Sequence, residues 1–587
     1  MARKVDLGFT PSKYQEEFFN FVKHGAGNAL IDAKAGTGKT LTAISSMKLI
    51  PNSQKCLFIA FNKSIADELS LKLKGRSNCT AKTVHSLGFL MLKRNIGSDI
   101  EVDEYKYRNY VKKNAPTLTK NTTFNSVQDF EQFVDNVSQL IDFARFNLAQ
   151  SVKEINNIAV KYSIPITKDE CEVVKKCLEW GKANTETIDY TDMVWLPVEE
   201  HMKPIGLTYD WVFIDECQDL SQCSTELFLK CLKRGGRFVA IGDPSQSIYF
   251  FSGASAEAFD NIKNYKNTTT FKLPITYRCP KSVVAFANTL VPDLLPREDA
   301  SEGVVEKNCK IKDLMDGDMV LCCSKAPLFT LYVMLLRKNK NCYIKGLDIG
   351  INLVKILNTI KMDELNSDLT KDGVFVRLFD HLFSERNKLM KIRGLDFKDA
   401  TLSSYIMEMY DTLNALTILS EKYTDKEKLI KHIEKIFAET SDGICLSTVH
   451  KAKGLEADNV YILCHSSMFA LMGKNEWEKK QEENLRYVAY TRAKKKLGFI
   501  SEKEIKPSGN LLDDNIILKE LMFIEEQVCK VLNKKPTDYS QNINLVKVKL
   551  QTKTDTSKHK KLENTISLEQ PKVNKSNSSF LLELENI

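Results

Sequence analysis

Two short segments constrain the fold of this chain more than any other part of its sequence. They read AKAGTGKT at residues 33–40 and VFIDECQDL at residues 212–220, and each follows a short apolar run. In the first segment, an expected buried strand ends at Ile31, and Gly36 and Gly38 allow the backbone to turn sharply. A turn of this kind directs consecutive N–H groups at a phosphate beside a helix N-terminus. The first segment therefore predicts a loop that binds the phosphates of a nucleoside triphosphate.

The side chains of both segments supply the charges that a bound nucleoside triphosphate requires. Lys39 would neutralise the β and γ phosphates, and the Thr40 hydroxyl would ligate Mg²⁺. An expected strand, Trp211 to Ile214, runs into the second segment, with Asp215 at its carboxyl end as a second ligand of the same ion. Glu216 follows, where it would orient or deprotonate the attacking water. The predicted phosphate-binding residues are Ala33, Lys34, Ala35, Gly36, Thr37, Gly38, Lys39 and Thr40.

The composition is typical of a multidomain protein of the cytoplasm. Its 587 residues exceed the roughly 100 to 200 of one domain, so several domains are expected. No apolar run approaches the roughly 18 residues of a membrane span, and the start, MARKVDLGFT, lacks the apolar region of a signal peptide. The 15 cysteines lack paired CxxC spacing, which predicts neither disulfides nor a zinc or iron–sulfur site. The net charge of +8 is compatible with a polyanionic partner but is too small to demonstrate one.

Alternating strand and helix patterns predict an α/β fold with two parallel sheets, each interrupted by helices. The first alternation comprises strands at 29–31, 57–60, 211–214 and 238–241, with helices beginning at Thr40 and Ser64. A second set of strands is expected at 319–323, 342–344, 444–447, 460–464 and 497–500. Helical patterns at about 90–203 and 351–439 separate the two parts of each sheet.

The predicted domain boundaries follow from this duplication. The first α/β domain comprises 1–89 and 204–276, around a helical insertion at 90–203. The second comprises 277–350 and 440–510, around a shorter helical insertion at 351–439. A C-terminal extension, 511–587, becomes rich in Lys, Ser, Thr and Asn, and we expect it to be largely disordered after about residue 535.

Further segments follow the phosphate loop in a fixed order along the chain. They are FIAFNKSIADEL (58–69), TAKTVHSLG (80–88), FVAIGDPSQSIYFFSGA (238–254), LPITYRCP (273–280), ICLSTVHKAKGLEADNVYI (444–462) and EENLRYVAYTRAKKKL (482–497). With the first two segments, this ordered set resembles the superfamily 1 DNA helicases of the UvrD, Rep and PcrA type over roughly residues 9–500. The resemblance implies two RecA-like domains, with ATP bound between them and single-stranded DNA crossing both.

The resemblance also assigns roles around the nucleotide. Arg278 and Arg492 resemble the family's arginine fingers, which would stabilise charge in the transition state. Gln246 resembles the residue that senses the γ phosphate. The predicted contacts to the nucleoside are Gln15, which resembles the adenine-reading glutamine, Tyr277, which resembles the aromatic that stacks on adenine, and Glu456, which resembles the group that bonds the ribose.

A protein that binds single-stranded nucleic acid without sequence preference requires aromatic side chains that stack on bases and hydrogen-bond donors that contact phosphates. Phe251 stands where relatives usually carry a stacking tryptophan, and Ser252 stands where an arginine is usual. Packing in a core is the alternative for the aromatic residues, and a capping or core role is the alternative for the histidines. The positions that resemble the family's strand contacts are Phe61, Asn62, Thr83, His85, Tyr249, Phe251, Thr448 and His450.

Two other groups of residues carry no predicted function. The run from Tyr105 to Lys113 interleaves tyrosine and lysine, but a solvated amphipathic helix with packed tyrosines explains it equally well. Asp189 and Asp192 lack the Glu-x-Lys constellation of a nuclease, so we assign them no catalytic role.

The resemblance implies an ATP-dependent 3′ to 5′ DNA helicase or translocase on single-stranded DNA, acting in replication, repair or recombination. Its partners would be single strands and junctions between single and double strands. The second insertion is about half as long as its counterpart in the bacterial relatives, which leaves open a translocase that displaces proteins with little unwinding. A nucleotide-switched DNA-binding subunit of a repair or defence complex, recruited through the C-terminal tail, is a third possibility.

The source and assembly of the chain are only weakly indicated. The bias toward Lys and Asn is typical of an AT-rich genome and is compatible with a virus or phage, in which case the host cytoplasm is the expected compartment. The sequence does not predict an oligomeric state.

Overall fold

The structure is a computed structural model that describes most of the chain up to residue 536. The chain forms two compact units, Met1–Gly350 with Lys435–Asp513 and Ile351–Glu434 with Asp514–Ile587. Within the described ranges, no helix is long and apolar enough to cross a membrane. The described residues are 8–60, 62–119, 124, 127–249, 258–359, 374–393, 395–420, 426–436, 443–464, 476–505, 514–532 and 534–536.

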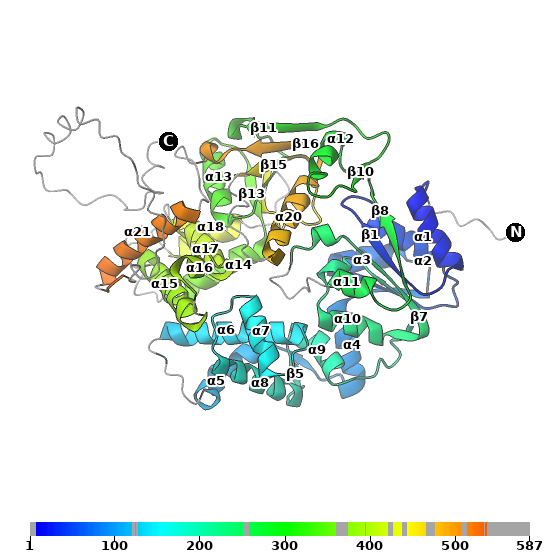
Figure 1. Ribbon diagram of the computed structural model, residues 1–587, viewed down its shortest axis with the longest axis horizontal. Helices are drawn as coiled ribbons and strands as arrows, with labels where there is room; N and C mark the ends of the chain where they lie inside the picture. Colours follow the sequence, from blue (N-terminus) through cyan, green and yellow to red (C-terminus); the bar gives the residue numbers. More distant parts are fainter. Residues whose placement is uncertain are drawn as a thin grey trace, which may run out of the picture. The chain divides into compact units, whose positions relative to one another are not determined.

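The first unit contains a six-stranded parallel sheet in the order β3-β2-β6-β7-β1-β8. Figure 1 labels β1, β7 and β8 of this sheet. Its strands are β1 (Asn28–Ala33), β2 (Cys56–Ala60), β3 (Cys79–Thr83), β6 (Tyr209–Ile214), β7 (Leu232–Gly242) and β8 (Thr268–Leu273). Ile31 lies opposite Ile241, and Phe58 lies opposite Phe213. Because all of these pairs are parallel, the carboxyl ends of β1, β2, β3 and β6 lie at one edge of the sheet.

Helices cover both faces of this sheet because successive strand residues point to opposite sides. Phe58 and Phe213 pack with α1, α2 and α3 on one face. Leu57 and Val212 pack with α4, α9 and α10 on the other face. The helices are α1 (Lys13–His24), α2 (Lys39–Met47), α3 (Lys63–Lys72), α4 (Val84–Ile96), α9 (Tyr190–Glu199), α10 (Gln222–Lys230) and α11 (Ala258–Lys263).

The sequence patterns do not predict the two edge strands, β3 and β8. Their sequences, CTAKT and TTTFKL, are rich in threonine and lysine, and several of their side chains are partly or fully exposed. The strands between them, such as β2 and β6, are almost entirely buried and form continuous apolar runs. Edge strands lose the continuous apolar pattern because only part of their surface is covered.

The first insertion is helical and shares a core with the second face of the sheet. The tyrosines of the 105–113 run pack inside it: Tyr107 is buried, and the ring of Tyr110 stacks on Trp180 with centroids 3.8 Å apart. These two tyrosines therefore have a packing role. The insertion contains α5 (Lys106–Leu118), α6 (Val127–Phe146), α7 (Val152–Lys161), α8 (Lys168–Ala183) and a short ribbon of β4 (Glu101–Val102) and β5 (Thr187–Ile188).

A buried cluster of charges joins the helices of this insertion. Arg145 on α6 is 1% exposed and donates to Asp189 and to Asp192, each at 2.7 Å. Lys106 on α5 donates to the second carboxylate oxygen of Asp192 at 2.7 Å, and Tyr107 donates to Asp192 at 2.8 Å. The Asp189 side chain also caps α9. The two aspartates thus have a structural role in this insertion.

The first unit also contains a second six-stranded parallel sheet, in the order β11-β16-β15-β12-β14-β13. The strands expected from the sequence in this part of the chain overlap β12, β13, β14, β15 and β16. The two sheets confirm the predicted α/β class. The elements are β11 (Val304–Cys309), β12 (Met319–Cys322), β13 (Cys342–Lys345), β14 (Ile444–Thr448), β15 (Ala457–Leu463) and β16 (Ala493–Ile500), with α12 (Lys281–Ala287), α13 (Lys325–Arg337) and α20 (Glu476–Tyr490) and a small ribbon of β9 (Ile275–Thr276) and β10 (Leu295–Pro296).

The described part of the second unit is helical and includes a segment that the sequence-based division placed in a separate extension. Arg386 on α15 donates to Glu525 on α21 at 2.8 Å, and both side chains are at most 2% exposed. This buried pair ties α21, within the predicted 511–587 extension, to the helices of the second insertion. The disorder expected after about residue 535 concerns residues that lie almost entirely outside the described ranges. The helices are α14 (Leu347–Thr359), which begins in the first unit, α15 (Val374–Arg393), α16 (Phe397–Thr401), α17 (Ser404–Ser420), α18 (Lys426–Ile436) and α21 (Asp514–Leu532).

The charge cluster of the insertion yields a prediction about stability. Replacing Arg145 by Met leaves two buried carboxylates without their shared cation, which typically costs about 3 kcal/mol or more. We expect Arg145→Met to lower the melting temperature clearly, whereas Lys175→Met, at a 41% exposed position, should change it little. Adding Asp189→Asn to Arg145→Met should restore part of the loss because one unpaired charge is removed. Equal melting temperatures for Arg145→Met and Lys175→Met would contradict a stabilising cluster.

Candidate nucleotide-hydrolysis site

The candidate phosphate loop joins the end of β1 to the start of α2. Gly36 and Gly38 have φ angles of 72° and 78°, in the left-handed region that favours glycine. A Cβ atom at Gly36 would lie 2.6 Å from the Thr276 hydroxyl oxygen, so this position requires glycine for space as well as for conformation. Within the loop, the Thr37 hydroxyl donates to the Lys34 carbonyl at 2.8 Å. The loop is therefore closed tightly on itself and on the end of β9.

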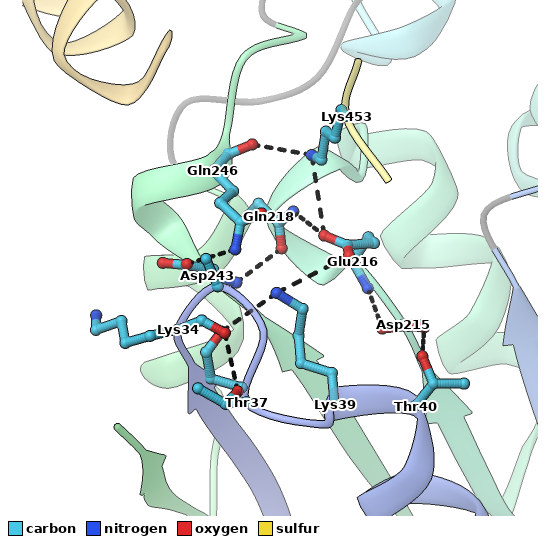
Figure 2. Close-up of polar contacts among 12 residues, drawn as sticks. Lys34, Thr37, Lys39, Thr40, Asp215, Glu216, Gln218, Asp243, Gln246 and Lys453 are labelled. Atoms are coloured by element: carbon cyan, nitrogen blue, oxygen red, sulfur yellow. Dashed lines mark hydrogen bonds and ion pairs between the residues drawn. The ribbon is translucent and has the colours of Figure 1, made fainter. Parts of the chain in front are cut away.

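The two acidic residues at the end of β6 lie beside this loop (Figure 2). The Thr40 hydroxyl donates to Asp215 at 3.2 Å. The Lys39 ammonium donates to the Ala33 carbonyl at 3.3 Å and lies 4.0 Å from a carboxylate oxygen of Glu216. The structure thus brings together the four side chains that the sequence assigned to phosphate, metal and water.

The oxygen donors of Thr40 and Asp215 fit a magnesium ion. Mg²⁺ prefers hard oxygen ligands and commonly takes one or two from the protein and the rest from phosphates and water. In the described part of the chain, no cluster of three or more His, Cys, Asp and Glu side chains could hold a metal by itself. An ion at Thr40 and Asp215 would therefore complete its coordination with the phosphates of a bound nucleotide.

The environment separates the pKa values of the two adjacent carboxyl groups. Burial raises the pKa of Asp215 to about 6, and repulsion from Glu216 acts in the same direction. Burial acts likewise on Glu216, but the positive charges of Lys39 and Lys453 outweigh it and lower the pKa of Glu216 to about 2. Glu216 is therefore ionised at neutral pH, as a carboxylate that takes a proton from water must be.

The backbone of Glu216 has an unusual conformation for a residue with a side chain. Its φ and ψ angles are 52° and 43°, in the left-handed region, and its N–H donates to the Asp215 carboxylate at 3.0 Å. Such strain persists only where the surroundings fix it, and it concentrates at functional positions. The turn directs the Glu216 carboxylate toward Gln218 and Lys453, as Figure 2 shows.

Gln218 is a site residue that the sequence analysis did not identify. It is 1% exposed, and its amide nitrogen donates to Glu216 at 2.5 Å. Its amide oxygen accepts from the Asp243 N–H at 3.0 Å, which connects the ends of β6 and β7. Gln218 therefore fixes the Glu216 carboxylate against the neighbouring strand. Its place two residues after Glu216 within the DECQDL segment was the available signal.

Lys453 is the second residue that the sequence analysis missed, and it comes from the second sheet. It lies in the loop after β14 and forms an ion pair with Asp219, which burial gives a raised pKa of about 6. Lys453 also donates to the Gln246 carbonyl at 2.9 Å and lies 3.9 Å from Glu216 (Figure 2). The acidic end of β6 is thus neutralised by one lysine from each sheet. The KAKGLE segment was noted in the sequence, but only its glutamate received a role.

The predicted γ-phosphate sensor and one predicted arginine finger meet directly. Gln246 donates to Asp243 at 2.7 Å, and its amide oxygen accepts from Arg492 at 3.3 Å. Burial, with repulsion from Arg278, lowers the pKa of Arg492 to about 9. Arg278 instead donates to Glu456 at 2.7 Å. The second predicted finger and the predicted ribose contact are therefore bonded to each other in this structure.

Other contacts between the two sheets surround the same residues. The Ala35 N–H in the phosphate loop donates to the Tyr487 hydroxyl on α20 at 3.0 Å. Asn484, also on α20, donates to the Ser247 carbonyl at 2.8 Å. Both residues of α20 are buried. The phosphate loop and the turn after β7 are thus in contact with one helix of the second sheet.

The two residues predicted to contact adenine differ in exposure. Gln15 is 2% exposed; it donates to the Thr42 hydroxyl at 2.8 Å and accepts from the Ser12 N–H at 2.9 Å in the N-terminal cap of α1. These bonds attach α1 to α2. Tyr277 is 44% exposed, and its N–H donates to the Gly36 carbonyl at 2.8 Å. Tyr277 thus presents a ring next to the phosphate loop, whereas the Gln15 amide is already bonded within the protein.

The predicted contacts to single-stranded DNA lie at or just after the carboxyl ends of β-strands in both sheets. Asn62 and Thr83 cap α3 and α4 after the neighbouring strands β2 and β3, and His85 lies in the first turn of α4. In the second sheet, Thr448 ends β14, and the His450 carbonyl accepts from the Tyr249 hydroxyl at 3.1 Å. Phe61, Phe251 and Ser252 lie outside the described residues. Burial lowers the pKa of His85 and, together with nearby lysines, lowers that of His450 to about 4.

His450 yields a prediction about pH. Its folded pKa of about 4 lies below the roughly 6.5 of an unfolded histidine, so unfolding takes up a proton between these values. The contribution of neutral His450 to stability is present above pH about 6.5 and is lost as the pH falls toward 4. Between pH 7 and pH 4.5, we expect the melting temperature of wild type to fall more than that of His450→Asn. The control His24→Asn, at an exposed position, should show the same decrease as wild type. Parallel curves for wild type and His450→Asn would contradict a depressed pKa.

Comparisons with known proteins agree with this geometry. Residues 14–267 match the family model described as the UvrD/REP helicase N-terminal domain, and residues 443–500 match the UvrD-like helicase C-terminal domain. The F-box DNA helicase protein 1 of Schizosaccharomyces pombe is 25% identical over 506 residues, which are 80% of this chain and 55% of that protein. A probable DNA helicase II homolog of Mycoplasma capricolum is 23% identical over 449 residues, 57% of this chain and 62% of the relative. The ATP-dependent DNA helicase Rep of Buchnera aphidicola from Acyrthosiphon pisum is 24% identical over 293 residues, 46% of this chain and 44% of the relative. The chain thus spans less than two thirds of the length of these three relatives.

Proposed function

Because the chain belongs to the UvrD/Rep family of helicases, we propose that it is an ATP-dependent DNA helicase that translocates 3′ to 5′ on single-stranded DNA. The observation that supports this proposal best is the ionised Glu216 carboxylate, fixed by Gln218 and placed between Lys39 of the first sheet and Lys453 of the second. Such a site combines a base that would orient the attacking water with a lysine, Lys453, whose distance from that base depends on where the second sheet lies. We propose Mg²⁺ as the metal and single strands and strand junctions as the partners.

The side chains of this site would act together on the γ phosphate of a bound nucleotide. The Lys39 ammonium, now bonded to the Ala33 carbonyl, would exchange this partner for the phosphate oxygens. Glu216 would accept a hydrogen bond from the attacking water and take its proton as the bond to the leaving ADP breaks. Arg492, already bonded to Gln246, would stabilise the charge that develops on the transferred group. A bound metal would add positive charge at Thr40 and Asp215.

Coupling of hydrolysis to movement requires that the two sheets shift relative to each other. Lys453 and Thr448 lie on one continuous segment at the end of β14. A displacement of this segment by DNA would therefore move Lys453 relative to Glu216 and Asp219. Conversely, ATP and its products would alter the contacts of Lys453 and Arg492 and so move the proposed DNA-contacting residues at the end of β14. We infer that turnover in the absence of DNA is slow.

Replacing the proposed base tests the chemistry. Glu216→Gln keeps the size of the side chain but cannot take a proton, so we expect ATP and DNA binding within about twofold of wild type and turnover reduced by at least about 100-fold. The matched control is Glu200→Gln at an exposed position, which should behave as wild type. Binding is measured with a fluorescent ATP analogue and turnover by phosphate release. Turnover within a factor of three of wild type would sink the assignment of Glu216.

Strand separation tests the activity itself. Matched duplexes with a 3′ or a 5′ single-stranded tail are incubated with ATP, with Lys39→Ala as the inactive control and phosphate release followed in the same tubes. We expect unwinding of the 3′-tailed duplex only. DNA-stimulated hydrolysis without unwinding would indicate instead a translocase that displaces proteins or needs a partner, for instance through the C-terminal tail. ATP-dependent DNA binding with little turnover would indicate a nucleotide-switched subunit.

The chemistry fits replication, repair or recombination, because each generates single strands and junctions. We propose that the protein acts in the cytoplasm, or in the host cytoplasm for a gene of viral or phage origin.

A further inference from the structure

Two cysteines that the proposed hydrolysis does not use lie side by side at the amino ends of β2 and β3. The parallel register places Cys56 directly opposite Cys79. Both side chains point to the same face of the sheet, because Cys56 belongs to the core formed with α1, α2 and α3, and Cys79 packs against that core. Neighbouring strands are about 4.8 Å apart. This spacing falls within the roughly 4.4 to 6.8 Å between Cα atoms that a disulfide spans.

The two thiols differ in access and in acidity. Cys56 is fully buried in the core, whereas Cys79 is half-buried on the edge strand. As neutral thiols, Cys56 donates to the Gln54 carbonyl at 3.8 Å and Cys79 to the Asn78 amide oxygen at 3.7 Å. A hydrogen bond from Cys56, together with the charge of Arg76, overcomes the effect of burial and lowers the pKa of the Cys79 thiol to about 7. The same interaction raises the pKa of Cys56.

The position of Arg76 is fixed by the backbone. Its guanidinium donates to the Lys48 carbonyl at 2.8 Å and to the Ile50 carbonyl at 2.6 Å. The Cys79 N–H in turn donates to the Arg76 carbonyl at 3.0 Å, so the cation and the thiol belong to one short turn. A fixed cation next to a half-buried thiol is the environment in which cysteines become reactive.

We propose that Cys79 and Cys56 form a site of reversible oxidation by hydroperoxides, with Cys79 as the attacking thiolate and Cys56 as the resolving thiol. The Cys79 thiolate attacks the terminal oxygen of the peroxide; the O–O bond breaks, Cys79 becomes a sulfenic acid, and hydroxide leaves from hydrogen peroxide or an alkoxide from an alkyl hydroperoxide. The Cys56 sulfur then attacks the Cys79 sulfur, the S–O bond breaks, and water leaves as the disulfide forms. Two thiols are oxidised in total, and one peroxide is reduced.

The bridge would be readily reversible. Side chains at paired positions of parallel strands stand side by side, whereas an unstrained disulfide brings its Cβ atoms to about 3.8 Å. Closing the bridge therefore requires a local adjustment of the edge strand, and strained disulfides are the more easily reduced ones. A dithiol would restore both thiols by exchange.

Cys342 provides an internal comparison in the same molecule. It is half-buried like Cys79, but burial raises the pKa of its thiol to about 12. Exposure alone would make the two cysteines equally reactive. The environment of Cys79 instead predicts a much larger thiolate fraction at pH 7.

The test uses the full chain in its native state. Reduced protein is treated at pH 7 with substoichiometric iodoacetamide, and the rate of labelling at each cysteine is followed by peptide mass spectrometry. Separately, protein is exposed to hydrogen peroxide, blocked and digested without reduction. We expect Cys79 to be labelled at least about tenfold faster than Cys342. We also expect peroxide to produce a peptide pair linked through Cys56 and Cys79 that dithiothreitol separates.

A variant separates the two steps. In Cys56→Ser the resolving thiol is absent, so dimedone should trap a sulfenic acid at Cys79, whereas Cys342→Ser should form the linked pair as wild type does. Labelling of Cys79 no faster than that of Cys342, or peroxide treatment of wild type without a Cys56–Cys79 linked peptide, would overturn the proposal. Both of these readings use wild-type protein and therefore do not depend on the folding of a variant.

Discussion

The balance of charge at the carboxyl end of β6 determines how the rest of the first unit is arranged. Two adjacent carboxylates, Asp215 and Glu216, are placed there by a buried strand, where bulk water cannot solvate them well. Cations must therefore approach from outside the strand. Lys39 comes from the phosphate loop, and Lys453 comes from the loop after β14. The two sheets are thus joined by the need to neutralise one acidic site, and a nucleotide with its metal would rearrange the same charges.

The parallel topology explains why these groups meet although they are far apart in the chain. Each strand of a parallel sheet delivers its following residues to the same edge. The helical insertion between β3 and β6 interrupts the sequence but not this edge, because its helices pack on one face of the sheet. Gln218 then links the β6 and β7 ends, and Arg492 and Lys453 bring the second sheet to the same place.

Much of this organisation could be predicted from the sequence because its signals are local. Gly36 and Gly38 mark the phosphate loop, and apolar runs mark the buried strands. The edge strands β3 and β8 have no such apolar run. The sequence of α21 likewise gives no signal that this helix packs against α15, where Arg386 pairs with Glu525. Gln218 and Lys453 were missed because their roles depend on contacts with other segments, and the amide of Gln218 looks like any polar residue of a turn. The internal bonds of Gln15, and the pairing of Arg278 with Glu456, also depend on the three-dimensional arrangement.

The left-handed backbone of Glu216 links activity to the evolution of stability. A residue with a Cβ atom in this conformation destabilises the fold by about 1 to 2 kcal/mol relative to glycine. Selection for stability alone would therefore favour glycine at this position, in the turn where β6 ends. The glutamate there is consistent with the role in hydrolysis that we propose for its carboxylate. If Glu216 acts as we propose, a sequence library screened only for thermal stability would gain stability and lose hydrolysis through the same substitution at this position.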